Sequence, residues 1–89
     1  MIYYEDKIKK ALKKGKPPKD IFIHINNAFI ALETTGDFSL FDIKKLKGSS
    51  NKIYYRLRKG KYRAIFYFEN SDYFVIALDK RGDVYKKWE

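Results

Sequence analysis

The sequence predicts an α+β domain in which two N-terminal helices pack on one face of a small, mostly antiparallel β-sheet. Apolar residues recur at helical spacing in the first half of the chain. The second half holds three short runs of aromatic and β-branched residues, as expected for consecutive strands. A chain of 89 residues can build one hydrophobic core. We therefore expect residues 1–89 to form a single two-layer domain.

The first half is expected to contain a short strand followed by two helices. The aromatic segment 1–4 has the composition of a strand. Asp6 can cap a helix that runs to about Lys14. Pro17 and Pro18 then fit the first turn of a second helix. That helix is apolar around most of its circumference, so we expect it to be covered on more than one side. Its apolar residues are Ile21, Phe22, Ile23, Ile25, Ala28, Phe29, Ile30 and Leu32.

The second half is expected to form an antiparallel meander. Its three strands are predicted at 53–58, 62–68 and 73–78. Lys59–Gly60 is a candidate two-residue hairpin turn, and Asn70–Ser71 is another. The connection 35–51 carries glycines and serines, and its middle can hold one short strand.

A turn at Lys59–Gly60 determines which side chains face each other across the first hairpin. Arg56 would face Arg63, and residues that face each other share one side of the sheet. The basic side is then expected to hold Tyr54, Arg56, Arg58, Lys61, Arg63, Ile65 and Tyr67. A tight second turn would add Phe74, Ile76, Leu78 and Lys80 to it. The side expected to lie under the helices holds Ile53, Tyr55, Leu57, Tyr62, Ala64, Phe66 and Phe68.

The net charge of +9 indicates a polyanionic partner. Nucleic acid, an anionic membrane surface and an acidic protein are the candidates. RNA is favoured, because aromatic side chains stack on bases and arginines bind phosphates through two parallel hydrogen bonds. The alternative is a set of solvated cations beside an apolar floor that the C-terminal tail covers. Between Ile43 and Phe68 there is no acidic residue to pair with Lys44, Lys45, Lys47, Lys52, Arg56, Arg58, Lys59, Lys61 and Arg63.

Several classes of protein are not indicated by the sequence. There is no cysteine, which excludes disulfides and thiolate metal sites. No His and carboxylate grouping has metal-ligand spacing, so we expect neither a metal nor a cofactor. The single histidine, His24, is expected to be an ordinary residue of the second helix. No apolar run reaches membrane-spanning length and no signal peptide is visible, so the expected location is the cytoplasm.

A series of short motifs runs through the second half of the chain. They are Leu46-Lys47-Gly48, Arg56-Leu57-Arg58, Gly60, Tyr62-Arg63 and Arg81-Gly82-Asp83-Val84-Tyr85. This series resembles the RelE/ParE toxin superfamily of bacterial and archaeal toxin–antitoxin modules. The resemblance implies two helices on a mostly antiparallel sheet. It also implies a cognate antitoxin that wraps the toxin, covers its basic and apolar faces, and forms a hetero-oligomer with it.

The resemblance implies one of two activities. RelE-like members cut mRNA on the ribosome without a metal, and ParE-like members inhibit DNA gyrase without being enzymes. The RelE-like activity, a cofactor-free endoribonuclease that blocks translation, is favoured here. Catalytic roles are then expected for Arg56, Arg63, Lys80, Arg81 and Tyr85. RNA binding is expected for Lys45, Lys47, Lys52, Arg58 and Lys61.

Two positions depart from the RelE-like pattern. Tyr54 stands where a basic residue is expected, and Arg56 stands where lysine is common. Arginine is a poor general base because it scarcely loses its proton. One of Lys45, Lys47, Lys52 or Lys80 would have to take the proton from the ribose hydroxyl.

A catalytically inactive relative and a plain single-stranded RNA-binding module remain as alternatives. For the second, Lys59–Gly60 followed by an aromatic strand is similar to one signature of the RRM domain. That match fails at Lys61, Tyr62 and Arg63, and two helices followed by a meander is the wrong order of elements for an RRM.

Overall fold

The computed structural model describes residues 1–46 and 52–80 of the chain. The predicted site residues Lys47, Arg81 and Tyr85 lie outside these ranges. The elements occur along the chain as β1 (Ile2–Tyr4), α1 (Asp6–Lys13), α2 (Lys19–Thr35), the 3₁₀ helix η1 (Phe38–Leu40), β2 (Ile43–Lys45), β3 (Tyr54–Lys59), β4 (Tyr62–Glu69) and β5 (Asp72–Lys80).

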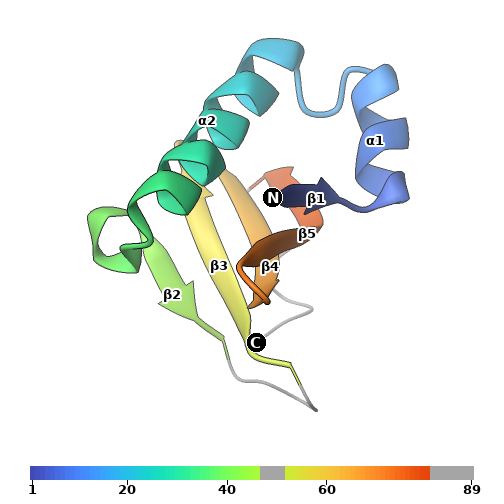
Figure 1. The fold of residues 1–89 in the computed structure, drawn as a ribbon. Helices are drawn as coiled ribbons and strands as arrows, with labels where there is room; N and C mark the ends of the chain where they lie inside the picture. Colours follow the sequence, from blue (N-terminus) through green and yellow to red (C-terminus); the bar gives the residue numbers. More distant parts are fainter. Residues whose placement is uncertain (47–51, 81–89) are drawn as a thin grey trace.

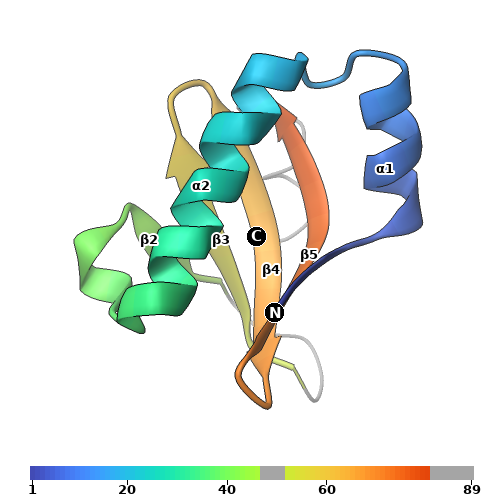
Figure 2. The same ribbon diagram turned by 45° about the horizontal axis from the view of Figure 1, so that its top comes forward.

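The strands form one mixed sheet with the order β1-β5-β4-β3-β2. Strands β2 to β5 are antiparallel to their neighbours, and β1 runs parallel to β5 at one edge. Both helices lie on the same side of the sheet, with α2 crossing over it and α1 beside β1 (Figures 1 and 2). The predicted α+β fold, the meander and the N-terminal strand are therefore confirmed. Neither helix of the described residues has the length and apolar character needed to cross a membrane.

The helix boundaries follow local rules, with one correction. The first helix begins after Glu5, and Asp6 lies in its first turn rather than capping it. No side chain caps this end, so Asp6 contributes there through its charge near the positive end of the helix dipole. The second helix begins after Pro18 and ends at Gly36, whose φ of 66° is the left-handed conformation that glycine adopts easily.

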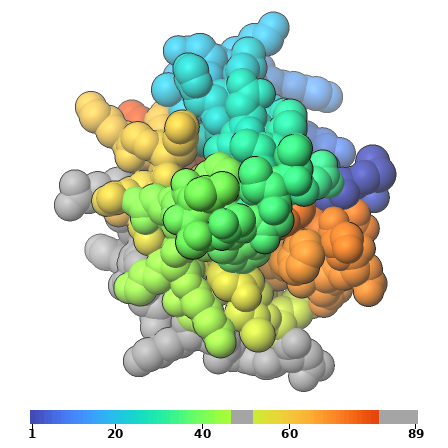
Figure 3. Space-filling model, turned by 60° about the vertical axis from the view of Figure 1, so that its left-hand side comes forward, coloured from blue at the N-terminus to red at the C-terminus, as the bar shows by residue number. Residues whose placement is uncertain are grey.

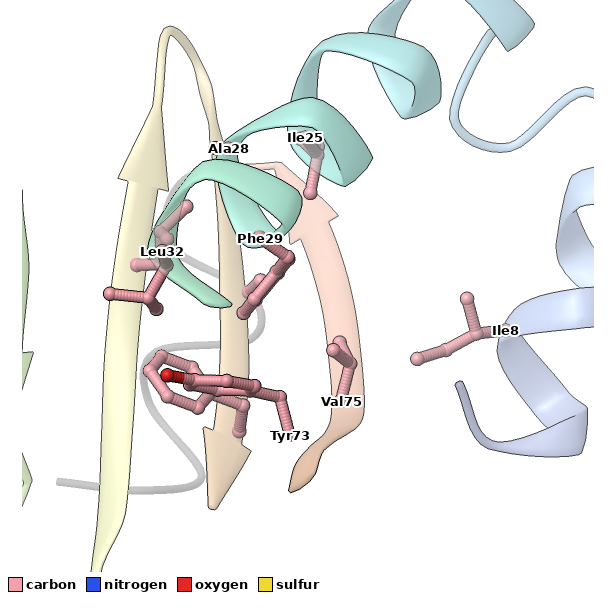
Figure 4. Close-up of a cluster of buried hydrophobic side chains, with 10 residues drawn as sticks. Ile8, Ile25, Ala28, Phe29, Leu32, Tyr73 and Val75 are labelled. Carbon is pink, nitrogen blue, oxygen red and sulfur yellow. The ribbon is translucent and has the colours of Figure 1, made fainter. Parts of the chain in front are cut away.

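The main core lies between α2 and the sheet. Ile25, Phe29 and Leu32 of α2 point into it and are essentially inaccessible to solvent (Figure 4). The ring of Phe29 meets that of Phe66 on β4 edge to face, with centroids 5.2 Å apart. Ile8 brings α1 into the same cluster against β5 (Figure 4).

The outer side of α2 is not covered by the described residues. Ile23 and Ile30 are 48% and 46% exposed. They are seven residues apart, so they lie on the same side of the helix, two turns from each other. Residues 1–46 and 52–80 thus leave this side of the helix open, and the expected second cover would have to come from elsewhere, such as the expected antitoxin.

The first hairpin turn lies one residue later than predicted. Its two central residues are Gly60 and Lys61, and Lys59 pairs with Tyr62. Gly60, at φ 60°, takes the first central position, where a type II′ turn requires a positive φ. Arg58 therefore faces Arg63, and Arg56 faces Ile65. The predicted pairs were wrong, but the predicted division of β3 and β4 between the two sides is confirmed, because the slip moved the register by an even number of residues.

The second turn is tight, as predicted, but a β-bulge follows it. Asn70 and Ser71 both have positive φ, and Tyr67 pairs with Phe74 beyond them. Between Phe66 and Ile65 the register shifts, and Ile76 of β5 is left without a partner residue. Ala77 consequently faces Ile65.

The bulge changes which residues of β5 reach each side of the sheet. Leu78 and Lys80 pair with Ala64 and Tyr62, on the helix side. Their predicted position on the basic side was wrong, because one extra residue reverses the alternation of side chains along a strand. Asp79 takes the place on the basic side, opposite Arg63.

Candidate nucleic-acid interface

The side of the sheet away from the helices carries the predicted basic residues, and we call it the arginine face. In residues 1–46 and 52–80 no helix lies on this face (Figure 1). The pairing of the strands assigns to it Tyr3 from β1, Phe74, Ala77 and Asp79 from β5, Arg63, Ile65 and Tyr67 from β4, Tyr54, Arg56 and Arg58 from β3, and Lys44 from β2.

The middle of the arginine face is a second, small hydrophobic cluster. Leu46, Ile65 and Ile76 are buried there, next to Tyr54 and Tyr67. Ile76, which the sequence placed on this side of the sheet, is only 8% exposed. The apolar centre is thus buried within the protein. The polar residues around it are the ones that can contact a ligand on this face.

Asp42, immediately before β2, binds two of the predicted arginines. Its carboxylate accepts a hydrogen bond from Arg56 at 3.1 Å and another from Arg58 at 2.5 Å. The backbone N–H of Arg58 also donates to the Asp42 carbonyl at 2.9 Å. The expectation that the basic patch has no acid of its own was wrong, because the acid-free segment begins one residue after Asp42.

The two arginines that share Asp42 differ in exposure. The side chain of Arg56 is 9% exposed and that of Arg58 is 50% exposed. Arg56 is therefore held in place by its surroundings and by the carboxylate, whereas Arg58 keeps donors directed to solvent. One carboxylate cannot neutralise two guanidinium groups, so this part of the face retains positive charge.

A row of four charged residues, with two arginines between two aspartates, crosses the arginine face. Asp42 lies opposite Arg58, Arg58 opposite Arg63, and Arg63 opposite Asp79. The two central arginines would repel each other if they stood alone, and the outer aspartates reduce that repulsion. In the next row Lys44 faces Arg56. The two rows hold more cations than acids, which suits a site for a phosphate group.

The structure brings together Arg56, Arg58 and Arg63 of the predicted site residues. Lys45 pairs with Tyr55, on the helix side, and Lys61 lies in the hairpin turn. Lys80 also falls on the helix side. Lys44 was missed, although its position two residues after Asp42 in a short strand could have placed it on the same side as the arginines.

Lys52 lies beside the aromatic part of the face and is bound there. Its ammonium group donates to Glu69 at 2.8 Å and sits 4.1 Å from the ring centroid of Tyr67. The hydrogen bond to Glu69 raises the pKa of Lys52 above its ordinary value. A raised pKa makes a lysine a weaker candidate for proton abstraction near neutral pH.

Four aromatic rings form a row across the far end of the arginine face. Tyr54 meets Tyr67 edge to face at 6.0 Å. Tyr67 stacks on Phe74 at 4.8 Å, and Phe74 stacks on Tyr3 at 5.2 Å. Tyr3 at the sheet edge is 43% exposed. The sequence did not place Tyr3 in the site, because parallel pairing of β1 with β5 joins segments from opposite ends of the chain.

Comparison with known proteins identifies solved structures with a similar architecture. No family model matches the sequence, and no curated protein matches it. Among solved structures, a chain of the RelE–RelB complex of Pyrococcus horikoshii matches with a TM-score of 0.70 and 26% identity, over 92% of this chain and 94% of that one. A second match is the antitoxin–toxin complex RelB–RelE of Methanococcus jannaschii, with a TM-score of 0.70, 25% identity, and 98% and 99% coverage.

The chain has a RelE-like fold. The resemblance to the RelE/ParE superfamily, seen in short motifs of the second half, thus extends over nearly the whole chain in three dimensions.

Proposed function

We propose that this protein is the toxin of a toxin–antitoxin module and that it cleaves mRNA on the ribosome without a metal ion. The proposal is supported by the RelE-like fold together with the arginine cluster on its sheet. Both similar structures are complexes of RelE with RelB, and the second is described as an antitoxin–toxin complex. The arginine cluster is what a site for a phosphodiester requires, since cations must hold the crowded phosphate as it reacts.

The residues take separate roles in this proposal. Arg56 and Arg63 bind the scissile phosphate, and Arg58 binds a neighbouring phosphate. Lys44, which faces Arg56 in the register, takes the proton from the ribose 2′-hydroxyl. By resemblance to the family, Arg81 lies near the leaving oxygen and Tyr85 stacks on the nucleotide. The burial and carboxylate contact of Arg56 give it a fixed position before RNA arrives, which lowers the cost of binding.

Primer extension on mRNA translated with purified protein tests the activity. Cleavage within the codon of the ribosomal A site is expected, and translation without any cleavage would contradict the proposal. Arg63→Ala should reduce cleavage about 100-fold or more, as for loss of a group that stabilises transition-state charge. Lys9→Ala on α1 is the matched control, because it removes the same charge from an exposed position far from the arginine face.

A cognate antitoxin is the partner we propose for the outer side of α2. Ile23 and Ile30 form an exposed apolar pair there, and the chain as a whole carries a charge of +9. A partner with an apolar helix face and acidic flanks matches both properties. A small acidic protein encoded beside this one should co-purify with it, and replacing Ile23 and Ile30 with Asp should abolish that co-purification.

Inhibition of DNA gyrase, as in the ParE-like branch, is the second candidate. The RelE and ParE branches share a fold, so the fold does not decide between them. Two observations favour the second candidate: Asp42 already binds Arg56, and Tyr54 takes a position that is basic in RelE-like chains. A supercoiling assay separates the two, because only a gyrase inhibitor blocks supercoiling.

A further inference from the structure

A cavity opens at the β2 edge of the molecule, between α2 and the end of β3. Figure 3 views this side, with the green segment 36–46 in the centre, α2 above it and the golden tip of the β3–β4 hairpin to the left. The cavity has a volume of about 430 Å³. It is lined by residues of α2, of the segment before β2 and of the end of β3.

The lining divides into an apolar floor and a polar rim. Ala28 and Ala31, one turn apart on α2, form the floor with Leu57, and Phe41 lies beside them. The small alanine side chains leave room for a flat group. His24 and Asn27 reach the rim from α2, and their side chains make no hydrogen bond with the rest of residues 1–46 and 52–80. These donors and acceptors are therefore available to a ligand.

The cavity is continuous with the arginine face through two residues. Asp42 and Arg58 line the cavity and also belong to the row of four charged residues. The half-exposed guanidinium of Arg58 stands between the two surfaces. An RNA strand with one phosphate on Arg58 can thus pass over the arginine face and turn its next base towards α2.

We propose that this cavity binds one unpaired nucleotide of the RNA, next to the scissile position. The base lies against Ala28, Ala31 and Phe41, and Asn27 bonds to its edge. Arg58 and Lys59 bind its phosphate. The volume falls within the roughly 300–1,000 Å³ of small-molecule sites, and an apolar slot with a few polar groups at the rim is the usual composition of such sites. This site rests on the proposed function for the choice of RNA, and it gives the protein a way to prefer certain bases.

Chemical-shift mapping of the wild-type protein tests the site directly. The probes are the four nucleoside 5′-monophosphates and a single-stranded RNA hexamer. Backbone amides of Ala28, Ala31 and Phe41 are expected to shift, and one base is expected to bind more tightly than the others. Shifts confined to the arginine face would overturn the proposal, as would equal affinity for all four mononucleotides and for inorganic phosphate.

Two variants of α2 add a matched test. Ala31→Phe fills the cavity and should weaken hexamer binding about tenfold, as expected for loss of one stacked base. Thr34→Phe adds a ring at an exposed position of the same helix outside the cavity and should leave hexamer affinity unchanged. Both variants must keep the wild-type thermal transition; if Ala31→Phe does not, Asn27→Ala takes its place. Undiminished hexamer binding by a folded, cavity-filled variant would overturn the proposal.

The outcomes separate this site from the proposed function. Hexamer binding in the cavity without mRNA cleavage on ribosomes would retain the site and reject the nuclease. Cleavage with normal base preference in Ala31→Phe would retain the nuclease and reject the site. Protection of the cavity by an antitoxin, with no shift from any RNA probe, would also reject it.

Discussion

The two sides of the central sheet are made by the same strands but differ in construction. On the helix side, consecutive inward residues are apolar and close against α2, with Phe66 and Phe29 at the centre. On the arginine face, a small apolar cluster is surrounded by a charged row and an aromatic row. Adjacent residues such as Phe66 and Tyr67 therefore have different roles: Phe66 fills the main core, and Tyr67 belongs to the aromatic row of the arginine face. The helix side provides the stability, and the arginine face uses it to hold charges that would otherwise repel each other.

The largest expected effect is on the helix side. Phe66→Ala should lower the free energy of unfolding by about 3–5 kcal/mol, because it opens a cavity in the main core. Tyr67→Ala, one residue later and only half-buried, should cost clearly less. Chemical denaturation followed by circular dichroism measures both. Equal losses would mean that the two sides contribute alike, contrary to the division described above.

A carboxylate on the arginine face should affect stability and RNA binding in opposite directions. Asp42→Asn leaves one good acceptor for two guanidinium groups and should cost about 1–2 kcal/mol of stability. It also removes a negative charge from the RNA surface. Affinity for single-stranded RNA should therefore rise, with a steeper dependence on salt.

The control for this variant is Asp20→Asn, an exposed residue at the start of α2 with the same change of charge. It should change salt dependence far less than Asp42→Asn. Loss of RNA affinity in Asp42→Asn would instead mean that the carboxylate is needed to orient the arginines.

Two neighbouring tyrosines of β1, one on each side of the sheet, allow the helix side and the arginine face to be compared by their dependence on pH. Tyr4 points to the helix side, where its hydroxyl donates to Asn26 at 2.8 Å, and burial raises its pKa above the ordinary 10.0. The unfolded chain then loses the proton before the folded protein does. The stability that Tyr4 contributes is fully present below pH 10 and is lost as the pH rises through the folded pKa.

Wild-type stability should therefore fall above about pH 10, and Tyr4→Phe should flatten this fall. Tyr4→Phe should also cost about 1 kcal/mol at neutral pH through the lost hydrogen bond. Tyr3→Phe, on the arginine face, is the control. Thermal unfolding over a pH series measures the effect, and identical profiles for all three proteins would argue against a titration at Tyr4.

The smallest effect is expected at Lys52. Its contacts with Glu69 and Tyr67 lie near the surface, so Lys52→Ala should change stability by less than about 1 kcal/mol. Cleavage activity should persist, because Glu69 holds this lysine away from base catalysis. A loss of cleavage comparable to that of Arg63→Ala would instead identify Lys52 as a catalytic residue.

The sequence was sufficient for the architecture and for the division of the residues of β3 and β4 between the two sides of the sheet, but not for the end of β5. Periodicity located both helices and the meander, because strand and helix spacings differ clearly over these lengths. The register was less predictable. Moving the turn from Lys59–Gly60 to Gly60–Lys61 costs little locally, yet it replaces an Arg56–Arg63 pair with an Arg58–Arg63 pair.

The acidic partners in the charged row were harder to foresee. Asp42 reaches the arginines only because β2 pairs with β3, and Asp79 reaches its place only because of the bulge. Pairing of distant segments and single-residue irregularities leave little trace in local composition. For this reason the cations could be found from the sequence and their counter-ions could not.

The unpaired Ile76 has a consequence for how such a surface can change over time. Residues beyond it on β5 owe their orientation to a single inserted position. Deleting Leu78, beyond the bulge, would move Asp79 opposite Ala64 on the helix side and bring Lys80 opposite Arg63, without altering any loop or the helices. The loss of one codon in this strand would thus replace one of the two aspartates of the charged row with a lysine, so related chains of similar shape can hold nucleic acid with different strengths.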